Sequence, residues 1–232
     1  MLFSPTYKAS PLLLALGLLL KFGAALGAEV NAGAIRVLTF IEVRVEARGH
    51  AGGVLRQYAS VLRDGRKMPP GQVILMQEIS RPERFAALER ETSAAVTQDD
   101  GEPRALTAGL TDDLTAPPDQ RFNREFDAIG AQVDGRANLY VVTHVDIATA
   151  DRSRVETELR KLAASARHSD GNFGFEILQQ VDRPNHFNLI SAWLSESLFR
   201  TFVASAETRE FRKTVAPLLG SPYDERLFRR VD

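Results

Sequence analysis

The sequence predicts an α+β fold of two ferredoxin-like βαββαβ repeats that pack sheet to sheet. The first observation is a near-repeat: residues 77–85 read QEISRPERF and residues 179–187 read QQVDRPNHF, at an offset of 102. A second set recurs at an offset of 105, where Leu114, Pro117, Asp119, Arg121 and Arg124 return as Leu219, Pro222, Asp224, Arg226 and Arg229. The third is that both halves carry strand and helix patterns in the same order. The chain is therefore one unit of about a hundred residues written twice.

Each repeat opens with a strand followed by a helix. In the first repeat, Thr39 to Val45 alternate between two faces, and in the second repeat Val141 to Ile147 do the same, which is the period of a strand. Val155, Leu159 and Leu162 are then spaced four and three apart, which gives one apolar stripe on a helix. Val54, Tyr58 and Val61 repeat that spacing 101 residues earlier.

A hairpin, a second helix and a last strand complete each repeat. Alternating residues from Phe175 to Val181 and from Phe187 to Trp193 predict the hairpin arms, with a turn at 182–185. Ser195 is a plausible N-cap for a helix that runs to Leu219 with a break near Ala206. A strand over 225–231 closes the repeat. We assign repeat one to 36–126, a linker to 127–137 and repeat two to 138–231; repeat one is the degenerate copy, because its second-helix region is shorter and interrupted.

Composition narrows the function classes. The chain of 232 residues is 44% hydrophobic and 25% charged, with net charge −1 and no cysteine. The lack of cysteine excludes disulfides, thiolate nucleophiles and iron–sulfur clusters. No long basic run is present, so nucleic acid is not an expected partner. The four histidines form no i, i+4 pair, so we expect no metal site.

The N-terminus predicts export. Lys8 precedes a ten-residue apolar run, 11–20, and small residues follow from Gly23 to Ala28. This order is typical of a cleaved signal peptide over residues 1–27, although Lys21 interrupts it. The alternatives are an uncleaved anchor and a disordered leader; about 20 apolar residues are needed to span a membrane, so a stable span is not expected after cleavage. The mature protein would then be periplasmic or secreted.

The second repeat resembles the antibiotic biosynthesis monooxygenase (ABM) family, in the dimeric α+β barrel superfamily. The resemblance rests on Arg183-Pro184-Asn185-His186-Phe187, on Ala192-Trp193, on the helix from Leu198 to Phe211 and on Ala216-Pro217-Leu218-Leu219. It implies that the tandem chain forms the family's dimer within one polypeptide, as an intrachain dimeric α+β barrel. Some family members are quinol or polyketide oxygenases that use no metal or flavin, and related domains degrade haem. The sequence does not decide whether the pseudo-dimer associates further into a homo-oligomer.

The resemblance also predicts a site, in repeat two. A cofactor-free oxygenase of quinol-like or polyphenolic aromatics needs an apolar cavity, a base and donors for an oxyanion. His144 is the candidate base and Trp193 the second candidate catalytic residue; the candidate substrate contacts are Tyr140, Gln179, Asn188, Phe199, Phe202 and Arg209. Phe202 and Glu207 stand where many members have histidine, which removes the usual haem ligand, and Glu91 stands where repeat two has Trp193.

Each candidate has a plainer interpretation. Trp193, Phe199 and Phe202 fit a buried core stripe, and His144 lies on a strand face that sheet-to-sheet packing makes an interface. We therefore keep an alternative to the oxygenase, which is a non-catalytic, exported small-ligand-binding or interaction protein on the same barrel. A filled cavity beside Trp193 would count against both functions at that place.

Overall fold

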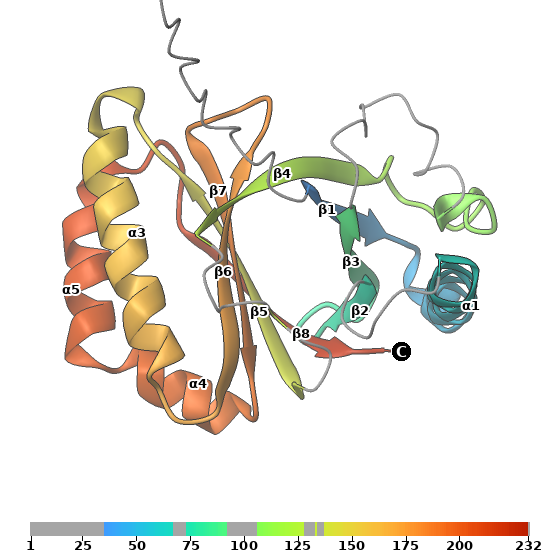
Figure 1. Cartoon of the computed structure of the whole chain (residues 1–232). Coiled ribbons are helices and arrows are strands. Elements are labelled where there is room, and N and C mark those ends of the chain that lie inside the picture. Colours follow the sequence, from blue (N-terminus) through green and yellow to red (C-terminus); the bar gives the residue numbers. More distant parts are fainter. Residues whose placement is uncertain (1–34, 67–72, 92–105, 128–132, 134–136, 232) are drawn as a thin grey trace, which may run out of the picture. The chain divides into compact units, whose positions relative to one another are not determined.

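Eight antiparallel strands close into a barrel in the order β1-β3-β2-β8-β5-β7-β6-β4, as Figure 1 shows for this computed structural model. The structure describes residues 35–66, 73–91, 106–127, 133 and 137–231, which belong to one unit, Ala32–Asp232. The strands are β1 Ile35–Glu42, β2 Val73–Glu78, β3 Arg84–Glu91, β4 Asp119–Asp127, β5 Leu139–Asp146, β6 Asn172–Gln180, β7 His186–Trp193 and β8 Asp224–Arg230. The predicted fold class is confirmed. The predicted leader and most of the predicted linker lie outside the described residues.

The last strand of each repeat joins the two repeats into one barrel. Within repeat one the strand order is β4-β1-β3-β2, and within repeat two it is β8-β5-β7-β6. β4 pairs with β1 of its own repeat and with β6 of the other, while β8 pairs with β5 and with β2. Every strand in the described part of the chain therefore has two neighbours, so this barrel has no open sheet edge.

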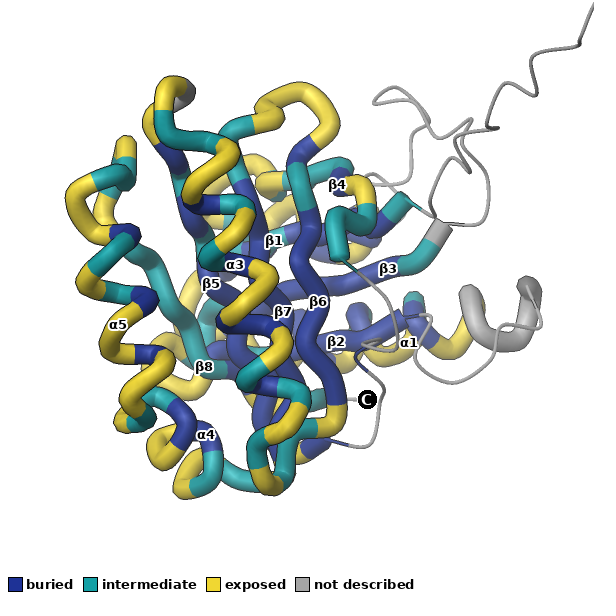
Figure 2. Tube along the Cα trace, turned by 60° about the vertical axis from the view of Figure 1, so that its left-hand side comes forward, coloured by how far each residue is buried: buried dark blue, intermediate teal, exposed yellow. Residues whose placement is uncertain are grey.

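Helices cover the outer faces of the barrel. α3 Arg152–Arg167, α4 Glu196–Val203 and α5 Ala206–Val215 lie on repeat two, and α1 Arg48–Arg66 lies on repeat one (Figure 1). Short 3-10 turns, η1 Val45–Ala47, η2 Thr149–Asp151 and η3 Ala216–Leu218, flank them. The strands are largely buried, whereas the helices alternate between buried and exposed residues (Figure 2). None of the helices in the described ranges is both long and apolar enough to span a bilayer.

The break in the second helix of repeat two has a local cause. Ser195 caps α4 by accepting a hydrogen bond from the Leu198 amide, as predicted. Ser205 is in extended conformation and caps α5 by accepting from the Thr208 amide. A serine whose hydroxyl serves a new helix end replaces the helical bonds that would continue α4. The break therefore falls at Ser205, next to the predicted position.

The period-two pattern separates three cores. Val141 and Val145 of β5 face the helices of repeat two, while Tyr140 and Val142 of the same strand face the barrel interior. A third core lies between repeat one and α1. Near one end of the interior, Arg36 and Glu176 form a buried ion pair at 3.0 Å between the two repeats.

The repeated QxxxRP motif is structural. Gln77 donates from Nε2 to the Pro82 carbonyl at 2.7 Å, and Gln179 donates to the Pro184 carbonyl at the same distance. Each glutamine thus closes its own hairpin turn, where proline leaves the strand ladder. The near-repeat that reveals the fold is explained by this turn, and needs no ligand.

Candidate functional site

The sheet of repeat two divides the predicted site residues between its two faces. Trp193, Phe199 and Phe202 belong to the core under the helices, whereas Tyr140 lies in the interior core. His144 follows interior-facing Val142 by two residues on β5, and Asn188 precedes interior-facing Ile190 by two residues on β7. Both side chains therefore face the barrel interior, where they contact each other. The indole of Trp193 and the imidazole of His144 therefore cannot touch the same small ligand.

The remaining two candidates have structural partners. Gln179 closes the β6–β7 turn through the Pro184 carbonyl. Arg209 donates to the Ala204 carbonyl beyond the end of α4 and is exposed. Neither side chain meets the other predicted residues.

The space beside Trp193 is filled. The cavity between sheet and helices there measures only about 20 Å³, which is room for about one water molecule. The Trp193 ring centroid lies 5.7 Å from that of Phe199 and 5.1 Å from that of Phe202, and its indole N–H donates to Ser191 Oγ at 2.9 Å. Burial raises the pKa of Tyr223, which lines this space, to about 12. This arrangement counts against a ligand site at Trp193.

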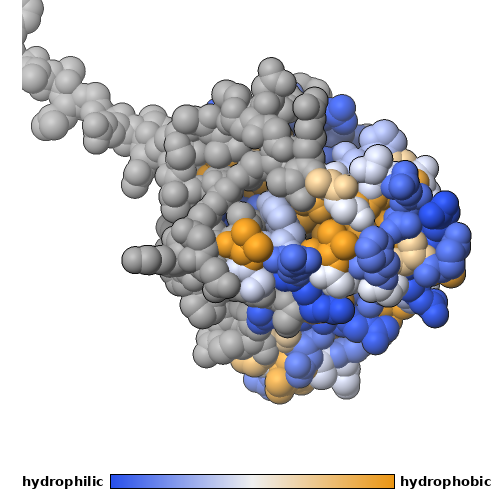
Figure 3. All heavy atoms as spheres, turned by 90° about the vertical axis from the view of Figure 1, so that its right-hand side faces the viewer, coloured by the Kyte–Doolittle hydropathy of each residue, from blue (hydrophilic) through white to orange (hydrophobic). Residues whose placement is uncertain are grey.

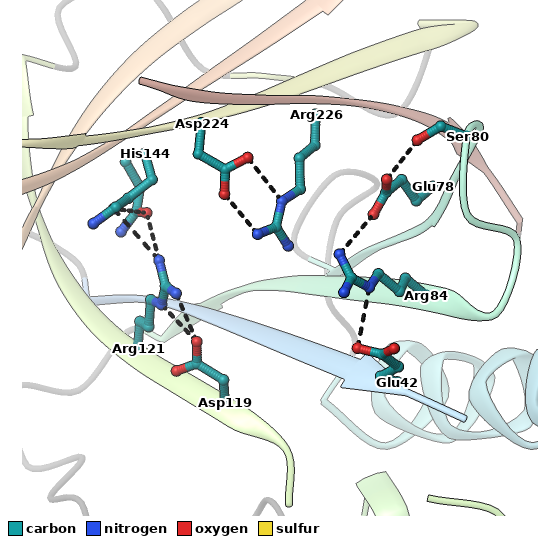
Figure 4. Close-up of polar contacts among 10 residues, drawn as sticks. Glu42, Glu78, Ser80, Arg84, Asp119, Arg121, His144, Asp224 and Arg226 are labelled. Atoms are coloured by element: carbon teal, nitrogen blue, oxygen red, sulfur yellow. Dashed lines mark hydrogen bonds and ion pairs between the residues drawn. The ribbon is translucent and has the colours of Figure 1, made fainter. Parts of the chain in front are cut away.

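A larger hollow lies at one end of the barrel, and we call it the barrel-end cavity. It measures about 230 Å³. Side chains from several strands converge there (Figure 4). Its walls combine aromatic rings, three arginines and three carboxylates: Phe40, Ile41, Glu42, Glu78, Arg84, Phe85, Ala116, Pro117, Asp119, Arg121, Arg226 and Phe228.

The arginines of the barrel-end cavity are held by ion pairs. Arg121 pairs with Asp119 and Arg226 with Asp224, each at 2.6 Å, on equivalent positions of β4 and β8. Both guanidiniums also lie over the Phe40 ring, at 4.8 and 5.6 Å from its centroid. The sequence indicates these Asp–Arg pairs because they recur in both repeats. Only closure of the barrel brings the two arginines to the same cavity.

Glu78 is the residue of this site that the sequence analysis missed. Its side chain is 5% exposed, and its Oε1 accepts from Ser80 Oγ at 2.6 Å. Its Oε2 has no hydrogen-bond donor among the described residues, and Arg84 Nη1 lies 3.9 Å away. A buried acceptor without a donor is unfavourable, so this oxygen is suited to receive an O–H or N–H from a ligand. The available signal was the departure from the repeat, where Gln180 stands in the second copy.

His144 contacts Arg121 but does not line the barrel-end cavity. Its Nδ1 lies 3.3 Å from Asn188 Oδ1 and 3.4 Å from Arg121 Nη1, and its Nε2 lies 3.3 Å from Nδ1 of His186. Burial, reinforced by the charge of Arg121, lowers the pKa of His144 below its ordinary value. Its imidazole is therefore neutral at pH 7. In the described part of the chain, no group of three His, Asp or Glu side chains is arranged to hold a metal ion.

The fold and the site define an eight-stranded α+β barrel with helices outside and a polar cavity at one end. The model of the family "Antibiotic biosynthesis monooxygenase" matches residues 138–214. Residues 138–214 thus match the ABM family, and the resemblance predicted from the motifs of the second repeat is confirmed. No curated protein matches the chain.

Several solved structures share the fold over most of the chain. A "putative monooxygenase" from Fusobacterium nucleatum has 8% identity and a TM-score of 0.70, covering 87% of this chain and 94% of that one. An anthrone oxidase-like protein has 12% identity and a TM-score of 0.64, covering 87% and 93%. A protein of the same description as the first, from Lactobacillus acidophilus, has 11% identity and a TM-score of 0.63, covering 86% and 95%. At these identities, the likeness concerns the fold.

Proposed function

We propose that the protein is a cofactor-independent monooxygenase that oxidises quinol-like or polyphenolic aromatics in the barrel-end cavity. The ABM domain of repeat two supports the reaction class. The observation that carries the site is the buried Oε2 of Glu78, an acceptor without a donor in a cavity with phenylalanine walls. The filled space beside Trp193 argues for this location over the one that the sequence suggested.

The cavity suits a hydroxylated ring. A cavity of about 150 Å³ in another protein holds benzene, so about 230 Å³ accommodates one ring with polar substituents. Phe40, Phe85 and Phe228 supply aromatic walls. A phenolic O–H would donate to Glu78 Oε2, and the guanidiniums of Arg84 and Arg226 would favour the phenolate that forms when the proton moves.

The chemistry balances without an added reductant. Glu78 accepts the phenolic proton, and the anion passes one electron to O₂. The resulting radical pair combines into a peroxide anion, which takes the proton back from Glu78 and becomes a hydroperoxide. Loss of water from the hydroperoxide then leaves a carbonyl and an ionised Glu78. For a simple quinol, one quinol and one O₂ give one hydroxyquinone and one water, so the substrate supplies all four electrons.

The test is oxygen uptake by the full chain with a panel of reduced quinols, measured above the autoxidation rate. We expect Glu78→Gln to lower the rate at least ~100-fold, because removal of a general base typically costs 10²–10⁴. Exposed Glu210→Gln on α5 is the matched control and should keep the wild-type rate.

Two outcomes would overturn the proposal. If uptake equals the blank for every quinol, the protein does not oxidise this substrate class, and ligand-induced thermal stabilisation would then test the binding-protein alternative. If Trp193→Phe abolishes uptake while Glu78→Gln does not, the reaction lies under the helices of repeat two.

We also propose that the chain is exported and that residues 1–27 are removed. The support is the order of charge, apolar run and small residues at the N-terminus. Mass spectrometry of the protein from a periplasmic or culture fraction should find an N-terminus near Ala28. A cytoplasmic chain with its N-terminus intact would overturn this assignment.

A further inference from the structure

We propose a second ligand site, for the phosphate group of a small molecule, in a groove on the outer surface of repeat one. This hollow, the arginine groove, measures about 380 Å³ and is lined by Arg48, Arg56 and Arg229, with Gly49 and Gly52 between them. It lies where α1 begins and β8 ends, near the C-terminal end of the described chain (Figure 1). It is not the site of the proposed oxygenase reaction.

The three arginines come from places far apart in the sequence. Arg48 and Arg56 belong to α1, one at its first residue and one two turns later, while Arg229 belongs to β8. No carboxylate lines the groove. The fold itself therefore brings three positive charges to one hollow, which a helix with a charged face would not do alone.

These charges lack ionic partners in the part of the chain that the structure describes. Arg48 and Arg229 form no ion pair there, and Arg56 donates only to the Val231 carbonyl, at 3.4 Å. The arginines of the barrel-end cavity behave differently, since Arg84, Arg121 and Arg226 each pair with a carboxylate. Converging unpaired guanidiniums repel one another, and a bound oxyanion would remove that repulsion.

The donor set favours phosphate. A guanidinium presents several N–H donors in a planar fork that matches phosphate oxygens. The glycines leave the backbone accessible: a Cβ built on Gly49 meets no atom within 4 Å, and one on Gly52 lies 3.5 Å from Arg56 Nη1. On this side of the molecule, strongly hydrophilic residues gather around a few hydrophobic ones (Figure 3).

The groove is particular to repeat one. The first strands, the 3-10 turns and the first helices of the two repeats each begin 104 residues apart, and at this offset Arg48, Gly52 and Arg56 correspond to Arg152, Glu156 and Arg160. The second repeat thus has a glutamate in place of Gly52, and Glu156 pairs with Arg152 at 2.7 Å, which neutralises a charge that stays unpaired in the first repeat. The arginine groove is therefore a feature of this chain's first copy, not of the shared fold.

The test is calorimetric titration of the full chain with inorganic pyrophosphate at low salt. We expect millimolar binding that weakens with added NaCl, because exposed charges are screened. Arg229→Gln should weaken binding about fivefold, equivalent to ~1 kcal/mol for one exposed ion pair. Arg154→Gln, at an exposed arginine on α3, is the matched control and should leave Kd unchanged.

Gly49→Asp provides a test that does not remove an arginine. A carboxylate in the first turn of α1 is favourable for the helix, and it places a competing negative charge in the groove. We expect Gly49→Asp to abolish pyrophosphate binding, whereas Gly49→Ala should retain it. Circular dichroism should show the same helix content in both variants.

Three results would overturn the proposal: no binding of pyrophosphate, equal binding by Arg229→Gln and wild type, or equal binding by Gly49→Asp and Gly49→Ala. Sedimentation with phosphatidylglycerol vesicles distinguishes the source of the phosphate. Vesicle binding that excess pyrophosphate displaces would place a lipid headgroup in the same groove. Vesicle binding without pyrophosphate binding would replace the small ligand with a membrane surface. Oxygen uptake by these variants should stay at the wild-type rate, so the two proposals fail independently.

Discussion

Arg36 and Glu176 connect the two repeats inside the barrel, and removing one of them should be severely destabilising. Arg36 Nε and Nη2 donate to the two carboxylate oxygens at 3.1 and 3.0 Å, and the Val133 amide donates at 2.6 Å. The side chains are only 3% and 1% exposed. Arg36→Met would leave the carboxylate buried, with the Val133 amide as its one remaining donor among the described residues. The expected loss in unfolding free energy at pH 7 is about 3–5 kcal/mol.

Urea denaturation of the wild type, of Arg36→Met and of a double variant would measure this effect. The double variant Arg36→Met/Glu176→Leu replaces both charges with apolar groups, and its stability should return to within ~1 kcal/mol of wild type or exceed it. Burial raises the pKa of Glu176, while Arg36 opposes that rise. Without Arg36 the folded-state pKa increases further, so the folded state binds a proton that the unfolded state has released. Arg36→Met should therefore be less destabilised at pH 5 than at pH 8.

The reasoning would be refuted if Arg36→Met cost less than ~1 kcal/mol at pH 8, or if the double variant were as unstable as the single one. The first result would mean that water or another donor satisfies the carboxylate. The second would mean that the loss comes from packing and not from an unpaired charge.

Two further predictions concern the backbone and pH. Gly171 has φ +73°, and a Cβ there would lie 2.3 Å from Leu198 Cδ1, so Gly171→Ala should lower the free energy of unfolding by about 1–3 kcal/mol. Gly53 lies in open space within α1, so Gly53→Ala should raise the free energy of unfolding by ~0.5–1 kcal/mol. Thermal unfolding would measure both changes, and equal melting temperatures of the two variants would contradict both predictions. Burial lowers the pKa of His144, so the unfolded chain takes up this proton first as pH falls below about 6.5 and stability decreases. NMR should find the His144 pKa below the ordinary histidine value of about 6.5, and His144→Gln should flatten the loss of stability between pH 7 and 5. An ordinary pKa for His144 would show that the ring is solvated.

The split of the predicted site shows where sequence patterns stop being informative. Alternation along β5 puts Leu139 and His144 on opposite faces, because they are five residues apart. Trp193 pairs with Leu139 across β5 and β7 and shares its face. The register that relates the two strands is not visible in either strand alone, so the sequence analysis placed Trp193 and His144 in one site when the sheet separates them.

The sequence by itself determined the repeat, the order of the elements, the two faces of each strand, the helix cap at Ser195 and the helix break near Ala206. These depend on interactions within a few residues or within one hairpin, which periodicity and turn residues report directly. The tertiary structure decided that β8 enters between β2 and β5, that Glu78 is buried without a donor, and that Arg229 meets α1. Those facts depend on closure of the barrel between residues more than 140 positions apart, as for Met76 and Arg230. Closure is set by the joint packing of both repeats, which no local pattern specifies.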